Sequence, residues 1–182
     1  MTDGRSRAAT FRVAVLGVLV LVLLAGCGTL VWLVAGRRGQ AEEVQQQREA
    51  VMSQTDQFML RMGTYGPDLL DSKGAMPEYR SRVKAVITPK FAVSFDKQAG
   101  TAEQLVAQSG VSRTAKVFAT GVSTLDGDSA EALVAGTFTD DYKKAGQQEP
   151  IPFRIKVMLV RTGGKWLVDN FMPVTGANGA GQ

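Results

Sequence analysis

The chain has 182 residues, of which 45% are hydrophobic, and it contains a single cysteine and no histidine. Without histidine, a Ser-His-Asp or Cys-His catalytic arrangement is excluded, and a zinc site built from Cys and His lacks ligands. The net charge of +4 comes from basic residues scattered among acidic ones, so the basic cluster with aromatic platforms that nucleic-acid binding needs is missing. We therefore expect no metal, no cofactor and no nucleic-acid partner.

An uncharged stretch of 22 residues runs from Val13 to Val34, with three arginines before it and two shortly after it. A helix of about 20 apolar residues crosses the hydrocarbon core of a bilayer. We therefore predict a transmembrane helix over residues 13–36, with the lipid bilayer as a partner. The positive-inside rule places residues 1–12 in the cytoplasm and the α+β body, residues 37–174, outside it. Residues 175–182, rich in Gly and Ala, are expected to form a flexible tail.

A second kind of anchor is left open by the sequence Leu24-Ala25-Gly26-Cys27. Small residues ahead of a cysteine, after an apolar segment, are typical of a lipidated cysteine. Cleavage before Cys27 would leave the apolar residues 29–34 directly behind the lipid, which an uninterrupted span explains more simply. Both anchors place the same domain on the same outer surface.

Three helices are expected after the span. Apolar residues recur at helical spacing between residues 41 and 62, and Gly63 and the following Gly66-Pro67 end this pattern. A second helix is expected over 77–86. A third begins at Pro89, with Thr88 as its cap. The residues from 98 to 110 fit either a last helical turn or an irregular crossing segment.

From Val111 onward, alternating β-branched and aromatic residues predict an antiparallel meander of four strands. Tight turns are expected at 126–128 and at Gly163-Gly164. The second strand is expected over 130–139 and the last over 166–171. Between the second and third strands, residues 140–149 are predicted to form a polar loop, in which Asp140-Asp141 and Lys143-Lys144 lie at a solvated tip.

Helices followed by an antiparallel four-stranded meander define an α+β domain. Helices that cup the inner face of a strongly curved sheet leave a cone-shaped cavity. This is the architecture of nuclear transport factor 2-like and cystatin-like domains. The predicted fold is therefore an N-terminal transmembrane helix followed by such a cone.

The end of the chain, from Val157 to Val174, contains two strands joined by Gly163-Gly164 and followed by Lys165-Trp166. Together with the arginine-bearing N-terminus, the span and the polar helix after it, this ending resembles the actinobacterial Mce-associated (mammalian cell entry-associated) membrane proteins. The resemblance implies a non-enzymatic accessory role in an envelope lipid importer, by assembly or stabilisation through the outer domain. It implies importer subunits as partners and a possible lipid ligand, and it brings no catalytic residues.

Two other functions stay open. A scaffold subunit of a type IV secretion or conjugation channel has the same plan of one span and one cone. An isomerase or dehydratase of the cone fold needs a buried carboxylate and a tyrosine in its cavity, for which Asp169 and Tyr79 are the candidates. Strict alternation places Asp169 on the face of Phe171, opposite Trp166.

Two groups of side chains are the candidate binding residues. The first group is aromatic and forms either an apolar pocket or the core: Phe91, Phe95, Phe118, Phe153 and Trp166. The second group consists of methionines on the first helix, which suit an adaptable docking face for a partner or pack in the core: Met52, Met59 and Met62.

Overall fold

The computed structural model describes residues 23, 26 and 41–174. It distinguishes two compact units, residues 1–46 and 47–182. Among the described residues, no helix is both long enough and apolar enough to cross a bilayer. The predicted span over 13–36 lies outside the described residues except for two positions, and so do Cys27 and the predicted tail.

The helical part contains a long helix over residues 41–63, a short 3-10 helix η1 (Pro67–Leu69), and the helices α2 (Pro77–Lys84) and α3 (Pro89–Ser109). The first helix ends at Gly63, as the sequence predicts. The Thr88 hydroxyl accepts a hydrogen bond from the backbone N–H of Phe91 and caps α3. The segment after residue 98 continues α3 without interruption. The helix then ends at Gly110, whose φ of 65° is the left-handed conformation that favours glycine.

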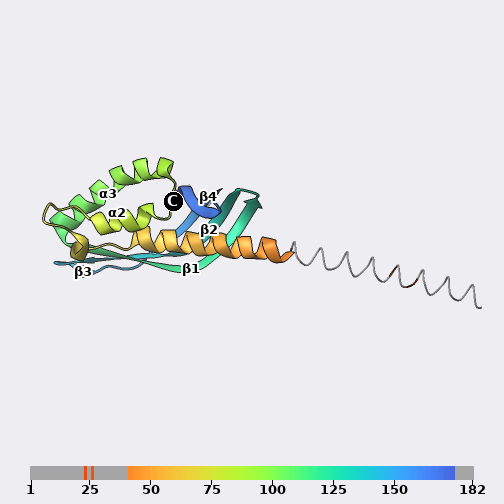
Figure 1. Ribbon diagram of the computed structural model, residues 1–182. Coiled ribbons are helices and arrows are strands. Elements are labelled where there is room, and N and C mark those ends of the chain that lie inside the picture. Colours follow the sequence, from red (N-terminus) through yellow and green to blue (C-terminus); the bar gives the residue numbers. More distant parts are fainter. Residues whose placement is uncertain (1–22, 24–25, 27–40, 175–182) are drawn as a thin grey trace, which may run out of the picture. The chain divides into compact units, whose positions relative to one another are not determined.

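The sheet is antiparallel, and its strands are β1 (Val111–Asp126), β2 (Ser129–Tyr142), β3 (Gly146–Gln147), β4 (Ile151–Thr162) and β5 (Lys165–Pro173). The strands pair in the order β1-β2-β4-β5, and the two-residue strand β3 pairs with the end of β2. The predicted meander is therefore confirmed for the four long strands. Figure 1 shows α2 and α3 on the same side of the sheet.

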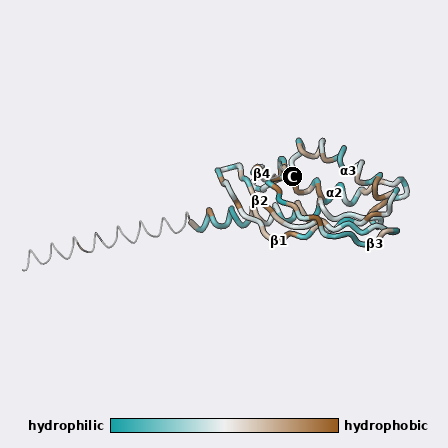
Figure 2. Tube along the Cα trace, turned by 180° about the vertical axis from the view of Figure 1, so that it is seen from behind, coloured by the Kyte–Doolittle hydropathy of each residue, from teal (hydrophilic) through white to brown (hydrophobic). Residues whose placement is uncertain are grey.

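The core lies between the helices and the covered face of the sheet. Hydrophilic and hydrophobic residues alternate along α3 and along the strands, as expected of elements with one covered face (Figure 2). The ring of Phe58 in the first helix packs 6.0 Å from that of Phe91 and 5.7 Å from that of Phe171, measured between ring centroids. These contacts join the first helix, α3 and β5, so the first helix packs on its own domain.

Strict alternation along the strands is wrong at three places, because single extra residues interrupt the pairing. On β1, the register with β2 shifts between Val117 and Ala119, and again between Val122 and Thr124. On β5, Asn170 pairs with Met158 of β4, and Val168 pairs with the next residue, Leu159. Asp169, between them on β5, has no partner residue. Each β-bulge moves the following side chains to the other face. This is why Phe171 packs in the core together with Val168.

The predicted loop over 140–149 begins too early. The strand β2 continues to Tyr142, and Asp140 is buried in it. Asp140 lies directly opposite Arg113 of β1, and the two side chains form a forked ion pair. Because the guanidinium balances its charge and makes two hydrogen bonds to it, the Asp140 carboxylate can be buried within a strand.

A polar clamp holds α2 against α3. Glu103, buried on α3, accepts two hydrogen bonds from the Arg80 guanidinium and one from the backbone N–H of Met76. The bond from Arg80 is the main cause that holds the pKa of Glu103 below its usual value. Glu103 therefore remains a charged partner of Arg80 at neutral pH. The clamp fixes Tyr79 of α2 beside Phe95 of α3, with 5.6 Å between their ring centroids.

A substitution at Gly136 of β2 would test how tightly the strands pack at this position. A Cβ atom there would collide with the backbone carbonyl of Lys116 and lie 2.6 Å from the Phe153 ring, whereas a Cβ at Gly121 of β1 meets nothing within 4 Å. We expect Gly136→Ala to lower the free energy of unfolding by about 1–3 kcal/mol, as overpacking does. Gly121→Ala, the matched control, should change it by less than about 1 kcal/mol. Denaturant unfolding of both full-length variants measures the difference, and equal effects would contradict this packing.

Candidate functional site

A cavity of about 220 Å³ lies between the helices and the sheet. Its walls come from the end of the first helix, from α2 and α3, and from all four long strands. They are mostly apolar: Met62, Gly63, Tyr65, Tyr79, Phe95, Ala102, Phe138, Ile155 and Phe171, with Gln98 and Arg113 as the polar members. The cavity thus occupies the position at which the cone prediction expects one.

Arg113 is the charged group of this cavity, and its charge is balanced. Its Nε donates to Asp140 Oδ1 at 2.6 Å, and its Nη2 donates to Oδ2 at 2.7 Å. Its guanidinium also lies over the rings of Tyr65 and Phe138, at 5.8 and 5.5 Å from the centroids. Among the described residues, neither Arg113 Nη1 nor the Tyr65 hydroxyl has a hydrogen-bond partner.

Two tyrosines line the same cavity. The Tyr79 hydroxyl donates to the backbone carbonyl of Met62 at 3.0 Å, and the rings of Tyr65 and Tyr79 meet edge to face, 5.4 Å apart. Burial raises the pKa of both hydroxyls above 10.0. Both tyrosines therefore stay protonated at neutral pH and act as hydrogen-bond donors.

Asp169, the candidate catalytic carboxylate, lies elsewhere. Its carboxylate accepts hydrogen bonds from the Thr88 hydroxyl at 2.8 Å and from Lys90 Nζ at 3.1 Å. The bond from Thr88, followed by that from Lys90, lowers its pKa below the usual 3.8. Asp169 is not among the residues that line the cavity of Tyr79. The arrangement that the enzyme alternative needs, with Asp169 and Tyr79 facing one cavity, is therefore not present, because the bulge at Asp169 turns its side chain to the start of α3.

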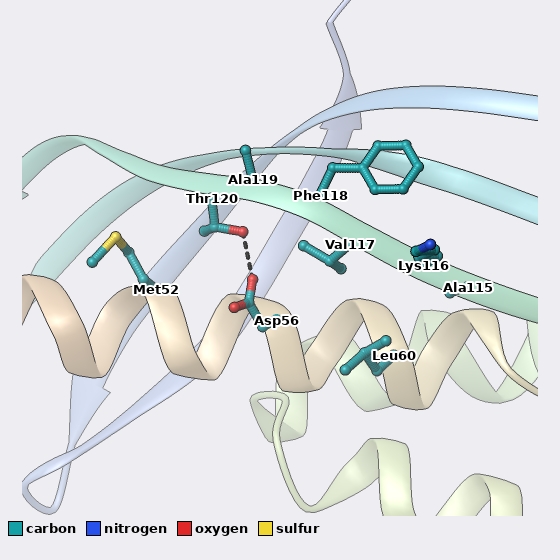
Figure 3. Close-up of a pocket in the computed structure, with 9 residues that line it drawn as sticks. All are labelled: Met52, Asp56, Leu60, Ala115, Lys116, Val117, Phe118, Ala119 and Thr120. Atoms are coloured by element: carbon teal, nitrogen blue, oxygen red, sulfur yellow. Dashed lines mark hydrogen bonds between the residues drawn. The ribbon is translucent and has the colours of Figure 1, made fainter.

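A second hollow, of about 510 Å³, runs between the first helix and β1. We call it the edge groove, and it is lined by Met52, Asp56 and Leu60 of the helix and by residues 115–120 of β1. Figure 3 shows Val117 and Thr120 directed toward the helix, with the Thr120 hydroxyl bonded to the Asp56 carboxylate, while Phe118 lies on the other side of the strand. Phe118 is 61% exposed and Leu60 is 43% exposed. The edge groove therefore presents large apolar groups to the surface.

The structure separates the predicted aromatic group. Phe91, Phe95 and Trp166 are buried in the core. Phe153 is partly buried, and its ring lies 4.4 Å from that of Phe138. Phe118 belongs neither to the core nor to the inner cavity, because it is the extra residue of the first bulge on β1.

The three methionines of the first helix lie in three different environments. Met59 is fully buried in the core. Met62 lines the inner cavity and Met52 lines the edge groove. A single docking face of all three methionines is therefore not formed, because they point to different sides of the helix.

Sequence reasoning missed Tyr65, Arg113 and Asp140. Counting back from the turn at 126–129 without bulges would pair Arg113 with Tyr142, whereas the two bulges on β1 move Arg113 opposite Asp140. The buried aspartate near the end of a strand, with an arginine near the start of its partner strand, was the available signal. Within the described part of the chain, no group of three or more metal-ligating side chains is present.

The fold and the cavity define an α+β domain in which helices pack on one face of an antiparallel sheet. The chain belongs to the family described as Uncharacterized protein Rv1363c/MT1408-like, whose model matches residues 8–173. No curated protein matches the sequence.

Several solved structures are similar to the chain. The intermembrane space region of the chloroplast protein ARC6 superposes with a TM-score of 0.50 at 10% identity, covering 71% of this chain and 97% of that one. The transfer protein TraH from the Gram-positive conjugative plasmid pIP501 gives 0.48 at 10% identity, with 71% and 95% covered. A protein described as NTF2 like and involved in plasmid conjugation gives 0.41 at 15% identity, with 72% and 50% covered. At its identity, the ARC6 superposition supports the α+β fold alone.

Asp169 is expected to stabilise the fold through its charge. Because its pKa is lowered in the folded state, this stabilisation is present above about pH 4 and is lost as the pH falls through the folded pKa. Asp169→Asn should lower the free energy of unfolding by about 1 kcal/mol at pH 7 and should lack this acid step. Urea unfolding of the full-length chain between pH 3 and 7 measures both effects.

Lys90→Ala is the control for the Asp169 variant, because Lys90 is 83% exposed and exposed ion pairs contribute little. It should change the unfolding free energy less than Asp169→Asn does. Parallel pH curves for Asp169→Asn and the unchanged protein would show that Thr88 and Lys90 do not hold the carboxylate.

Proposed function

We propose that the chain is a non-enzymatic accessory membrane protein of an Mce-type envelope lipid-import complex, and that it acts by docking to protein subunits of the importer. In this proposal, residues 13–36 cross the cell membrane, the N-terminus is cytoplasmic, and residues 37–174 lie outside the cytoplasm. The observation that carries the proposal is the edge groove, an open hollow with apolar walls on the outside of the domain.

The composition of the edge groove supports a protein partner. Its helical wall presents the side chains of Met52 and Leu60, and its rim carries Phe118, with Lys116 Nζ 5.6 Å from the ring centroid. Methionine and aromatic side chains are enriched in protein interfaces, where charged groups are depleted at the centre. The carboxylate of Asp56 is already bonded to the Thr120 hydroxyl. Asp56 therefore keeps this hydrogen bond when the groove is covered.

The titratable groups support a structural role over catalysis. Asp140 and Glu103 are engaged with arginines, and Asp169 is engaged with Thr88 and Lys90. A general base has to be free to accept a proton from a bound substrate. Hydrogen bonds from Arg80 and from Thr88 lower the pKa of Glu103 and of Asp169, respectively, whereas a carboxyl group that works as an acid or base near neutral pH needs a raised pKa.

Substitution of the groove rim tests this function. We expect Phe118→Glu to reduce the importer subunits recovered with the tagged full-length chain from detergent extracts by roughly tenfold, because it replaces a large exposed apolar group of the contact by a charge. Leu60→Glu, on the opposite wall, should act in the same way. The measurement is quantitative mass spectrometry of the recovered subunits, together with lipid uptake in a strain that lacks the chain.

Val93→Glu is the matched control, because Val93 is 64% exposed on α3 and does not line the groove. It should leave the recovery unchanged. The proposal would be refuted if no importer subunits were recovered with the unchanged protein and if the deletion strain took up lipid normally. Recovery of a conjugation ATPase in their place would point to a channel scaffold.

A further inference from the structure

We propose that the inner cavity, which Tyr65 and Arg113 line, is a binding site for a small uncharged molecule with one apolar ring and one hydrogen-bond-accepting oxygen, such as an aryl ketone. This site is separate from the edge groove and does not depend on the importer assignment. The proposal is carried by the size of the cavity, by its apolar walls and by two donors that have no partner among the described residues.

The size of the cavity restricts the ligand. A dry cavity of about 150 Å³ in a protein core accommodates benzene, whereas pockets for drug-sized ligands span about 300–1,000 Å³. The inner cavity, at about 220 Å³, lies between these limits. It therefore accommodates a single substituted ring.

The walls of the cavity restrict the polarity of the ligand. Five aromatic rings and several aliphatic groups line the space, including Phe95, Phe138 and Phe171. Water in such a space needs two to four polar partners. The Tyr79 hydroxyl is already bonded to the Met62 carbonyl, so it offers no free proton. An apolar ring is therefore the group that these walls accommodate best.

Two unused donors determine the polar part of the ligand. The Tyr65 hydroxyl and Arg113 Nη1 have no protein hydrogen-bond partner among the described residues, both residues line the cavity, and both atoms are within reach of solvent, because Arg82 Nε alone is both buried and unpaired in the described part of the chain. The forked pair with Asp140 neutralises Arg113, so an anion gains no net charge attraction there. Because burial raises the pKa of Tyr65, its hydroxyl remains a donor at neutral pH. An uncharged ligand oxygen with free lone pairs satisfies these donors.

The cavity has a route to the surface. Gln98 of α3 and Arg113 of β1 line the cavity, and Gln98 is exposed while Arg113 is partly exposed. A ligand can therefore enter between α3 and the start of β1 without unfolding of the core.

Methionine methyl signals provide a direct test, because Met62 lines the inner cavity and Met52 lines the edge groove. The full-length chain, labelled with 13C at its methionine methyl groups, is titrated in detergent micelles with acetophenone and with ethylbenzene. The two probes have nearly the same shape, but only acetophenone carries an acceptor oxygen. We expect acetophenone to shift the Met62 signal to saturation without moving Met52, and ethylbenzene to bind about three- to tenfold more weakly.

Two variants test separately the hydrogen bond from the Tyr65 hydroxyl and the volume of the inner cavity. Tyr65→Phe keeps the ring and removes the hydroxyl, so it should lower the affinity for acetophenone about three- to tenfold. The matched control is Tyr142→Phe, because Tyr142 does not line the cavity, and it should leave this affinity unchanged. Ala102→Leu fills the space and should abolish the Met62 shift. An unmoved Met62, parallel unsaturated shifts of Met52 and Met62, or equal binding of both probes would each overturn the proposal.

Discussion

The extra residue that β1 carries at Phe118 is the constraint on which both candidate sites depend. It shifts the register with β2, so Val117 and Thr120 both turn toward the first helix while Phe118 stays outside (Figure 3). The same shift helps bring Arg113 opposite Asp140, which supplies the polar end of the inner cavity. One local insertion therefore exposes an aromatic group on one face and aligns a charged pair on the other.

The pair of Arg113 and Asp140 is the most demanding interaction of the sheet. The side chain of Asp140 is 10% exposed, and a carboxylate so far from water is tolerated only with a close, hydrogen-bonded partner of opposite charge. Arg113 meets this need with two bonds, and its backbone also pairs with Tyr65 in both directions, at 2.7 and 3.0 Å. The pair therefore ties the ends of β1 and β2 to the segment after the first helix, and it fixes the cavity wall at that end.

The sequence predicted the order of the elements, because this order depends on local signals. Thr88-Pro89 marks the start of α3, and Gly163-Gly164 marks the last hairpin turn. The positions of the bulges could not be predicted, since a bulge is set by packing between layers and leaves no regular pattern in one strand. The errors about side-chain direction on the strands follow from this gap, including the exposed Phe118 and the separation of Asp169 from Tyr79. The candidate site was predictable as a cavity, but its donors were not.

Both edges of the sheet are partly closed, which restricts how the domain can associate. On the outer edge of β1, the Ala115 N–H donates to Thr64 Oγ1 and the Val122 carbonyl accepts from Arg48. On the outer edge of β5, Val168 is bonded to the segment before α3 through both its N–H and its carbonyl. Edges engaged in this way resist the addition of a foreign strand. These contacts disfavour strand addition, whereas the edge groove presents large apolar side chains from a helix and a strand at the surface.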